Sequence, residues 1–131
     1  MTAEHLVDTD IAIEALRKRD QELMAQMRAA GTVALSSISL YELRFGAERS
    51  ADPERNHRAV DELVAATIVL PFDHVVAAEA GVIRTALAGA GTPIGPYDVL
   101  IAAHARVRNL TLVTRNVKEF RRVEGLHLAK W

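Results

Sequence analysis

The chain has 131 residues, a formal net charge of −1, 50% hydrophobic and 25% charged residues, and no cysteine. A chain of this length is expected to form one domain over residues 1–131, and its composition excludes the low hydrophobicity of disordered proteins. The lack of cysteine excludes disulfides, thiolate zinc sites and cysteine nucleophiles.

The N-terminal segment does not have the pattern of a signal peptide. No basic start precedes its short apolar run, and acidic residues interrupt that run. No segment approaches the roughly 18 apolar residues of a membrane-spanning helix. We therefore expect a soluble, cytoplasmic protein that does not contact a membrane.

Short apolar runs predict strands, and the stretches between them have helical periodicity. The first strand is expected at 5–7, followed by helices at 11–18 and 20–30, the second with Asp20 as its N-cap. The later elements are a strand at 32–37, helices at 40–49 and 53–66, a strand at 67–72, helices at 73–88 and 96–108, a strand at 110–114, a short turn at 117–120 and a segment, LHLAKW, that is compatible with a terminal edge strand.

Strands that alternate with helices are typical of an α/β protein. We expect a three-layer sandwich in which a central, mainly parallel sheet of about five strands has helices on both faces. In open sheets of this kind, ligands bind beyond the carboxyl ends of the strands. Residues that directly follow a predicted strand are therefore the candidates for function.

Two aspartates interrupt the apolar run LVDTDIAI, directly after the first strand. Asp10 is in position to cap the following helix, and we interpret it as that cap. Asp8 is then left without a capping role and adds a second charge at the edge of the sheet. We predict that Asp8 is a functional carboxylate.

Glu42 lies in the helix that follows the second strand, on the flank of an apolar stripe. Arg44 and Glu48 point elsewhere and are spaced to pair at i and i+4. An unpaired carboxylate beside core residues is costly, and a metal ion or an arginine would relieve that cost. Arg49 is the alternative to a metal as the partner of Glu42.

Asp98 and Asn116 complete the set of candidates. Asp98 begins the buried stripe of the helix at 96–108, although acids are also common in first turns simply because the helix dipole favours them. Asn116 follows the fourth strand, where an asparagine alone is typical of a turn. However, Asn116 is expected at the same edge of the sheet as the acids that follow the other strands, and its side chain also carries an oxygen.

The combined pattern is three carboxylates and one amide, with the five histidines scattered along the chain. Hard oxygen ligands favour Mg²⁺, with Mn²⁺ as a second option, and Mg²⁺ in proteins commonly binds substrate phosphates. The stretch 106–122 contains six basic residues against one acid, Glu119. Such a cluster can neutralise phosphates, although a solvated charged surface is the alternative. The pattern predicts phosphoryl chemistry.

Four segments resemble the PIN-domain ribonucleases, and specifically the VapC-type toxins of bacterial toxin–antitoxin pairs. They are LVDTDIAI, SSISLYELRFGA, IGPYDVLIAAHA and LTLVTRNVKEFRRVEGLHLAKW. Their order and spacing make the resemblance specific over nearly the whole chain. Only the rhythm of helices and a strand supports the segment 52–91. The resemblance implies a PIN-like fold and a magnesium-dependent endoribonuclease.

The resemblance also implies the roles of individual residues. Asp8, Glu42 and Asp98 would form an acidic pocket, with Asn116 at a fourth position where many relatives have aspartate. Asp8 and Asp98 would be the principal metal ligands, Glu42 would orient or deprotonate a water, and Asn116 would position a ligand or a water. Glu119, one turn further on, is a candidate for the missing carboxylate.

RNA and protein partners follow from the same resemblance. Arg115, Lys118 and Arg121 would hold the RNA backbone near the acidic pocket. The resemblance implies a homodimer, a VapB-type antitoxin that inhibits the toxin with a C-terminal segment across the active site, and operator DNA bound only through that antitoxin.

Two alternatives stay open. The sequence DTD after an apolar strand is similar to the nucleophile motif of haloacid-dehalogenase phosphatases, but Ala12 stands where Thr or Val is expected, and no later pair of acids with a lysine appears. The second alternative is a PIN module that binds RNA or a protein without cleavage. The intact carboxylates argue against it, because gathered acids cost stability unless a cation is bound.

Overall fold

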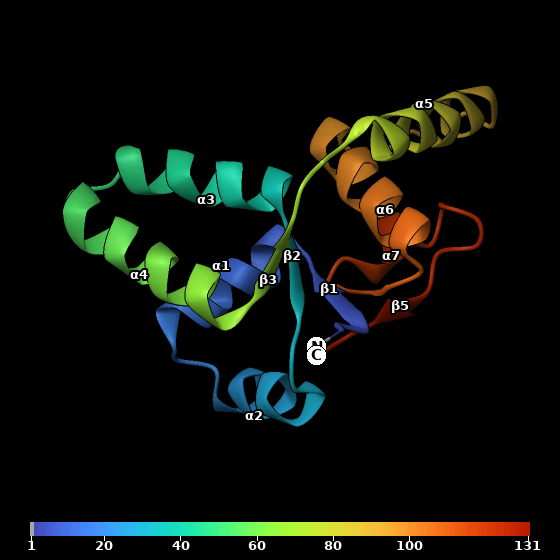
Figure 1. Cartoon of the computed structure of the whole chain (residues 1–131). Helices are drawn as coiled ribbons and strands as arrows, with labels where there is room; N and C mark the ends of the chain where they lie inside the picture. The colour runs from blue at the N-terminus through green and yellow to red at the C-terminus, as the bar shows by residue number, and fades with distance from the viewer. Residues whose placement is uncertain (1) are drawn as a thin grey trace.

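A five-stranded parallel sheet forms the centre of the structure, a computed structural model that describes residues 2–131 (Figure 1). The strands are β1 (His5–Val7), β2 (Ala34–Ser36), β3 (Ile68–Leu70), β4 (Thr111–Val113) and β5 (Leu128–Ala129). Their spatial order is β3-β2-β1-β4-β5, and each neighbouring pair is parallel. The predicted α/β architecture is confirmed, and LHLAKW does supply an edge strand.

Helices cover both faces of this sheet. They are α1 (Thr9–Arg17), α2 (Gln21–Ala30), α3 (Ser37–Glu48), α4 (Pro53–Ala66), α5 (His74–Gly89), α6 (Pro96–Arg108) and α7 (Val117–Phe120). The sheet lies between the group α1 to α4 and the group α5 to α7 (Figure 1). None of the helices in residues 2–131 is long and apolar enough to cross a membrane.

One hydrophobic cluster lies on each face of the sheet, because successive strand residues point to opposite sides. Leu6 is buried in the cluster that contains Ile101 of α6 and Phe120 of α7. Its neighbour Val7 is buried in the cluster that contains Ile11 of α1 and residues of α2 and α4. The core therefore fixes β1, and with it the residue that follows, from both sides.

Two helices begin earlier than predicted, because the residue that caps each of them is different. Asp8, not Asp10, is the N-cap of α1, and its side chain accepts a hydrogen bond from the Thr9 N–H. Asp10 is an exposed residue in the first turn. Ser36 likewise caps α3 by accepting from the Ile38 N–H, so this helix begins at the end of β2 rather than three residues later.

The expected pair of Arg44 with Glu48 is wrong. The Arg44 guanidinium donates to Asp61 at 2.6 Å, and Glu48 lies 2.7 Å from the His57 ring nitrogen. Both partners come from α4, which packs along α3, so contacts between helices replace the contact within one helix. Arg49 lies 5.1 Å from the centroid of the Phe45 ring and does not pair with Glu42.

Candidate active site

Asp8 stands at the carboxyl end of β1 and is almost fully buried, with 5% of its surface exposed. Its backbone N–H donates to the Val113 carbonyl of β4 at 2.9 Å. Its carboxylate accepts from the Thr9 N–H at 2.8 Å and from the Thr114 hydroxyl at 2.9 Å. Burial raises the pKa of Asp8 although both hydrogen bonds act to lower it. The same side chain thus caps a helix and projects a carboxylate from the edge of the sheet.

Thr9 connects this edge to α3. Its hydroxyl donates to the Glu42 carboxylate at 2.8 Å and lies 2.8 Å from the Ser39 hydroxyl, which is fully buried. Glu42 therefore has a polar partner that the sequence reasoning missed. The repeated hydroxyl-bearing residues of LVDTDIAI and SSISLYELRFGA were the available signal, because a buried hydroxyl beside an acid needs a bonding partner.

Asp98 and Glu119 share a hydrogen bond on the α6 side of the site. Burial, the hydrogen bond to Glu119 and the negative charges of Glu119, Asp8 and Glu42 raise the pKa of Asp98 to about 7. The backbone N–H of Gly95 donates to Glu119 at 2.9 Å and is the main reason that the pKa of Glu119 is lowered. The four acids are thus close enough for their charges to act on one another.

Gly95 is small because Asp98 lies directly against it. A Cβ at position 95 would be 2.9 Å from the nearer Asp98 carboxylate oxygen and 3.8 Å from a Glu119 oxygen. The backbone at Gly95 has φ −55° and ψ 147°, which any residue before a proline can adopt. Space next to the carboxylates, and not backbone conformation, therefore requires a glycine.

Asn116 joins the cluster through Glu119. Its backbone N–H donates to the Thr114 hydroxyl at 3.0 Å, and its side-chain amide donates to the Glu119 carboxylate. Thr114 in turn donates to Asp8, so one hydrogen-bonded path leads from Asp8 through Asn116 to Glu119. The predicted residues Asp8, Glu42, Asp98 and Asn116 are brought to one edge of the sheet, and Glu119 belongs with them.

The donor groups of this site are the oxygens that a small divalent cation prefers. Within residues 2–131, no three acidic or histidine side chains already surround a single point as metal ligands. Asp98 and Glu119 are instead hydrogen-bonded to each other, and Asp8 and Glu42 accept from threonine hydroxyls. No lysine or arginine in that part of the chain forms an ion pair with Asp8, Glu42 or Asp98. The chemistry of the donors fits Mg²⁺ or Mn²⁺, and among the four acids Glu119 is stabilised by the charge of Arg122.

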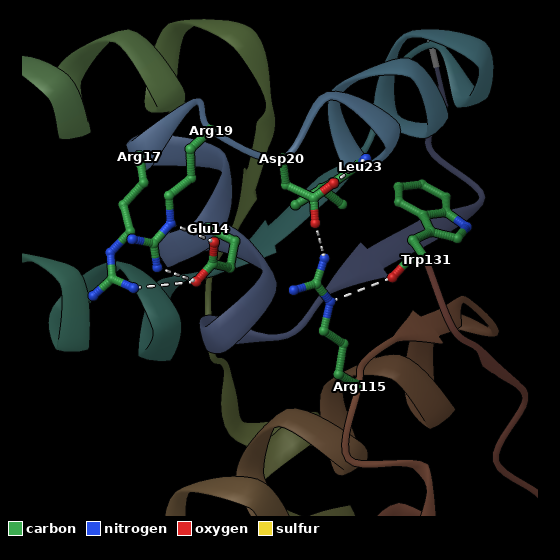
Figure 2. A network of polar contacts seen from close by, with 7 residues as sticks. All are labelled: Glu14, Arg17, Arg19, Asp20, Leu23, Arg115 and Trp131. Atoms are coloured by element: carbon green, nitrogen blue, oxygen red, sulfur yellow. Dashed lines mark hydrogen bonds and ion pairs between the residues drawn. The ribbon is translucent and has the colours of Figure 1, made fainter.

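The three basic residues predicted to hold RNA have different surroundings. The Arg115 guanidinium donates to Asp20 at 2.5 Å and to the Trp131 carbonyl at 3.4 Å, so it connects the end of the chain to the N-cap of α2 (Figure 2). Lys118 and Arg121 lie on and next to α7, are exposed, and form no ion pair with any residue of 2–131. They stay available beside Asn116 and Glu119, whereas Arg115 is already engaged.

Two hollows adjoin the acids. A groove of about 870 Å³ runs between α1, α3 and α4, with apolar walls that include Leu16 and Val60 and basic residues such as Arg17 and Arg55. A pocket of about 280 Å³ is lined by Thr9, Asp10, Ile13, Tyr41, Glu42, Phe45 and Tyr97. Glu42 lines both hollows, so both open onto the candidate site.

Comparisons with known proteins identify the family and the fold of the chain. The model of the PIN-domain family matches residues 5–126. The tRNA(fMet)-specific endonuclease VapC of Shigella flexneri is 39% identical over 127 residues, which cover 96% of each chain. The DNA-bound VapBC of Salmonella typhimurium superposes with a TM-score of 0.95 at 37% identity and 99% coverage of both chains. VapBC2 of Rickettsia felis, bound to a DNA fragment from its promoter, gives a TM-score of 0.92 at 34% identity, covering 97% of this chain and 98% of that chain. The haloacid-dehalogenase alternative for the DTD motif has no support from these matches.

Proposed function

The chain belongs to the PIN-domain family and to its VapC-type ribonucleases, and from that premise we propose that it is a toxin that cleaves RNA with a bound Mg²⁺ or Mn²⁺. The whole of residues 1–131 would form one PIN domain. The toxin would be the nuclease partner of a VapB-type antitoxin, like the relatives solved as VapBC complexes.

One observation supports this proposal above the others. Asp8, Glu42, Asp98 and Glu119 come from four separate parts of the chain, and burial, the hydrogen bond to Glu119 and the charges of the other three acids raise the pKa of Asp98 to about 7. Crowded carboxylates without a protein cation destabilise a fold unless they bind a proton or a metal ion. A divalent cation would replace the proton that Asp98 and Glu119 share.

Asp8 and Asp98 would hold the cation, and the hydrogen bonds of Thr9 and Thr114 would fix the orientation of Asp8. A bound Mg²⁺ supplies an activated water and neutralises charge that develops on the phosphate. Glu42 uses one oxygen for the Thr9 hydroxyl, so its other oxygen is left to accept the proton of the attacking water. Asn116 would hold Glu119 in place.

Exposed basic residues would hold the flanking phosphates. Lys118 and Arg121 lie next to the acids with their charges unpaired in residues 2–131, so they would contribute most. Arg115 would have to exchange Asp20 for a phosphate, and we expect it to contribute less.

The groove between α1, α3 and α4 would receive the antitoxin segment. Its apolar walls suit the apolar face of an amphipathic segment, its rim carries both basic and acidic residues, and it leads to Glu42. A segment seated there would close the acidic site to RNA. A homodimer would complete the toxin, and operator DNA would be bound through the antitoxin.

Filling this groove tests where the antitoxin binds. Gly46 lines the groove, and a Cβ added there would meet no atom within 4 Å. Gly46→Trp is therefore expected to leave the fold intact. Its indole would fill part of the groove, and we expect antitoxin binding to weaken about tenfold or more, a free-energy cost similar to that of overpacking a core. Calorimetric titration of the variant with the antitoxin measures the effect, and Gly81→Trp on α5, also in open space, is the matched control. Equal affinities of both variants would place the antitoxin elsewhere.

The nuclease assignment is tested by incubating the purified chain with RNA. Initiator tRNA is the first substrate to try, because the Shigella flexneri relative is named for it. We expect discrete fragments on a gel in millimolar Mg²⁺ or Mn²⁺, none in EDTA, and no release of product from p-nitrophenyl phosphate. Cleavage that persists in EDTA would exclude the metal, and the absence of cleavage of any RNA in Mg²⁺ would exclude the function.

A further inference from the structure

Three aromatic side chains are exposed beside the acidic site. Tyr41 and Phe45 on α3 have 53% and 52% of their surface exposed, and Tyr97 on α6 has 44%. All three line the pocket of about 280 Å³. Large aromatic side chains that stay exposed together are unusual on a protein surface and commonly mark a binding site.

The two tyrosines face this pocket from different helices. Their ring centroids are 6.0 Å apart and their planes are tilted by 49°, so the rings do not stack on each other. The hydrogen bond to Tyr41 raises the pKa of Tyr97. Phe45 already has Arg49 over its ring, which leaves Tyr41 and Tyr97 as the open aromatic surfaces.

The remaining lining residues indicate what kind of group the pocket accepts. Asp10 and Glu42 give it negative charge, which repels a phosphate and attracts the amino groups at the edge of a nucleobase. Arg49, over the ring of Phe45, is the basic group next to this lining. Aromatic faces with acidic groups at the side suit a base that has left its stack.

The position of the pocket connects it to the reaction. Thr9 and Glu42, which are hydrogen-bonded to each other, line the pocket and belong to the acidic site. A phosphate placed at the acids therefore brings one of its two neighbouring nucleotides to the tyrosines. Because the pocket adjoins the acidic site, RNA is favoured over an unrelated protein as its ligand.

We propose that Tyr41 and Tyr97 form a stacking subsite for one unpaired nucleobase adjacent to the bond that is cleaved, and thereby help to select the cleavage position. The inference rests on the proposed ribonuclease function. It adds a specificity-determining pair of residues that act on substrate position and not on the chemical step.

The test removes the base and the aromatic rings separately. After the cleavage site in a short single-stranded RNA is mapped, copies with one abasic nucleotide at each flanking position are titrated against the Asp98→Asn chain, which we expect to bind RNA without cleaving it. One abasic position is expected to weaken binding about five- to a hundredfold, the range for loss of one base stacked on an aromatic ring. Adding Tyr41→Ala or Tyr97→Ala should weaken binding of the intact RNA and abolish the abasic effect.

Two further measurements make the result specific. Tyr41→Phe and Tyr97→Phe keep the rings and should bind like the parent, and Val82→Ala, which removes an exposed apolar group on α5, is the surface control. In the cleaving protein, the alanine variants should raise KM and leave kcat within a few fold. An abasic effect that is the same with and without the tyrosines overturns the proposal, and so does loss of the dimer in light scattering without a change in RNA binding. Absence of cleavage by the parent chain would instead refute the ribonuclease function itself.

Discussion

Asp98→Asn is expected to reduce RNA cleavage at least about a hundredfold and to stabilise the metal-free protein. Removing a residue that is hydrogen-bonded to a metal ligand commonly lowers metal affinity or activity about 10- to 100-fold. Asp98 would be a direct ligand, so its removal is expected to cost at least as much. Single-turnover cleavage of a labelled RNA in Mg²⁺ measures it. Glu124→Gln is the matched control, because it removes an exposed charge that lies outside the site and its pockets.

The stability effect has a definite sign. Since the pKa of Asp98 is raised from 3.8 to about 7, the folded state binds this proton more tightly than the unfolded chain. The contribution of Asp98 to stability is therefore present below pH 4 and is lost as the pH rises to about 7. In EDTA, the Asn variant should melt close to the parent at pH 4 and about 5 °C above it at pH 8. A variant that melts below the parent at pH 8 would mean that the carboxylates are not crowded.

Gly95→Ala is expected to reduce cleavage about a hundredfold while the fold is retained. The new methyl group would lie 2.9 Å from the Asp98 carboxylate, which must move away, and a displacement of about 1 Å at a reacting centre can cost that much. The backbone at position 95 accepts alanine, so the melting temperature should change little.

Gly46→Ala is the control for this substitution. It is also a glycine-to-alanine change at a helix, but its Cβ enters open space. We expect full activity and a gain of about 0.5–1 kcal/mol in the free energy of unfolding, the usual difference between alanine and glycine in a helix. Urea unfolding and the cleavage rate of both variants provide the comparison. Equal rates for the two variants would show that the Asp98 carboxylate does not need its present position.

Local patterns were sufficient to predict most elements of the fold. The apolar runs and the cap at Asp20 gave helices and strands that agree with the structure to within a few residues. The cap of α1 was assigned wrongly because Asp8 and Asp10 both have the chemistry of a cap. Only the turn that follows β1 decides between them, and it puts the extended backbone at Asp8.

Contacts between distant residues were harder to predict. The convergence of the carboxylates could be predicted from the sequence, because the carboxyl ends of parallel strands meet at one edge of a sheet. The bond from Gly95 to Glu119 and the closeness of Gly95 to Asp98 depend on how α6 and α7 dock, which no local pattern contains. Arg115 likewise pairs with Asp20 across 95 positions of the chain, so its side chain is less available than its sequence neighbourhood indicated (Figure 2).

Titration with Mn²⁺ followed by electron paramagnetic resonance tests most directly whether these acids form a cation site. The free-ion signal should disappear in proportion to added protein for the parent chain and for Glu124→Gln, and should persist for Asp98→Asn. Identical binding curves for all three proteins would contradict a cation held at the carboxyl edge of the sheet.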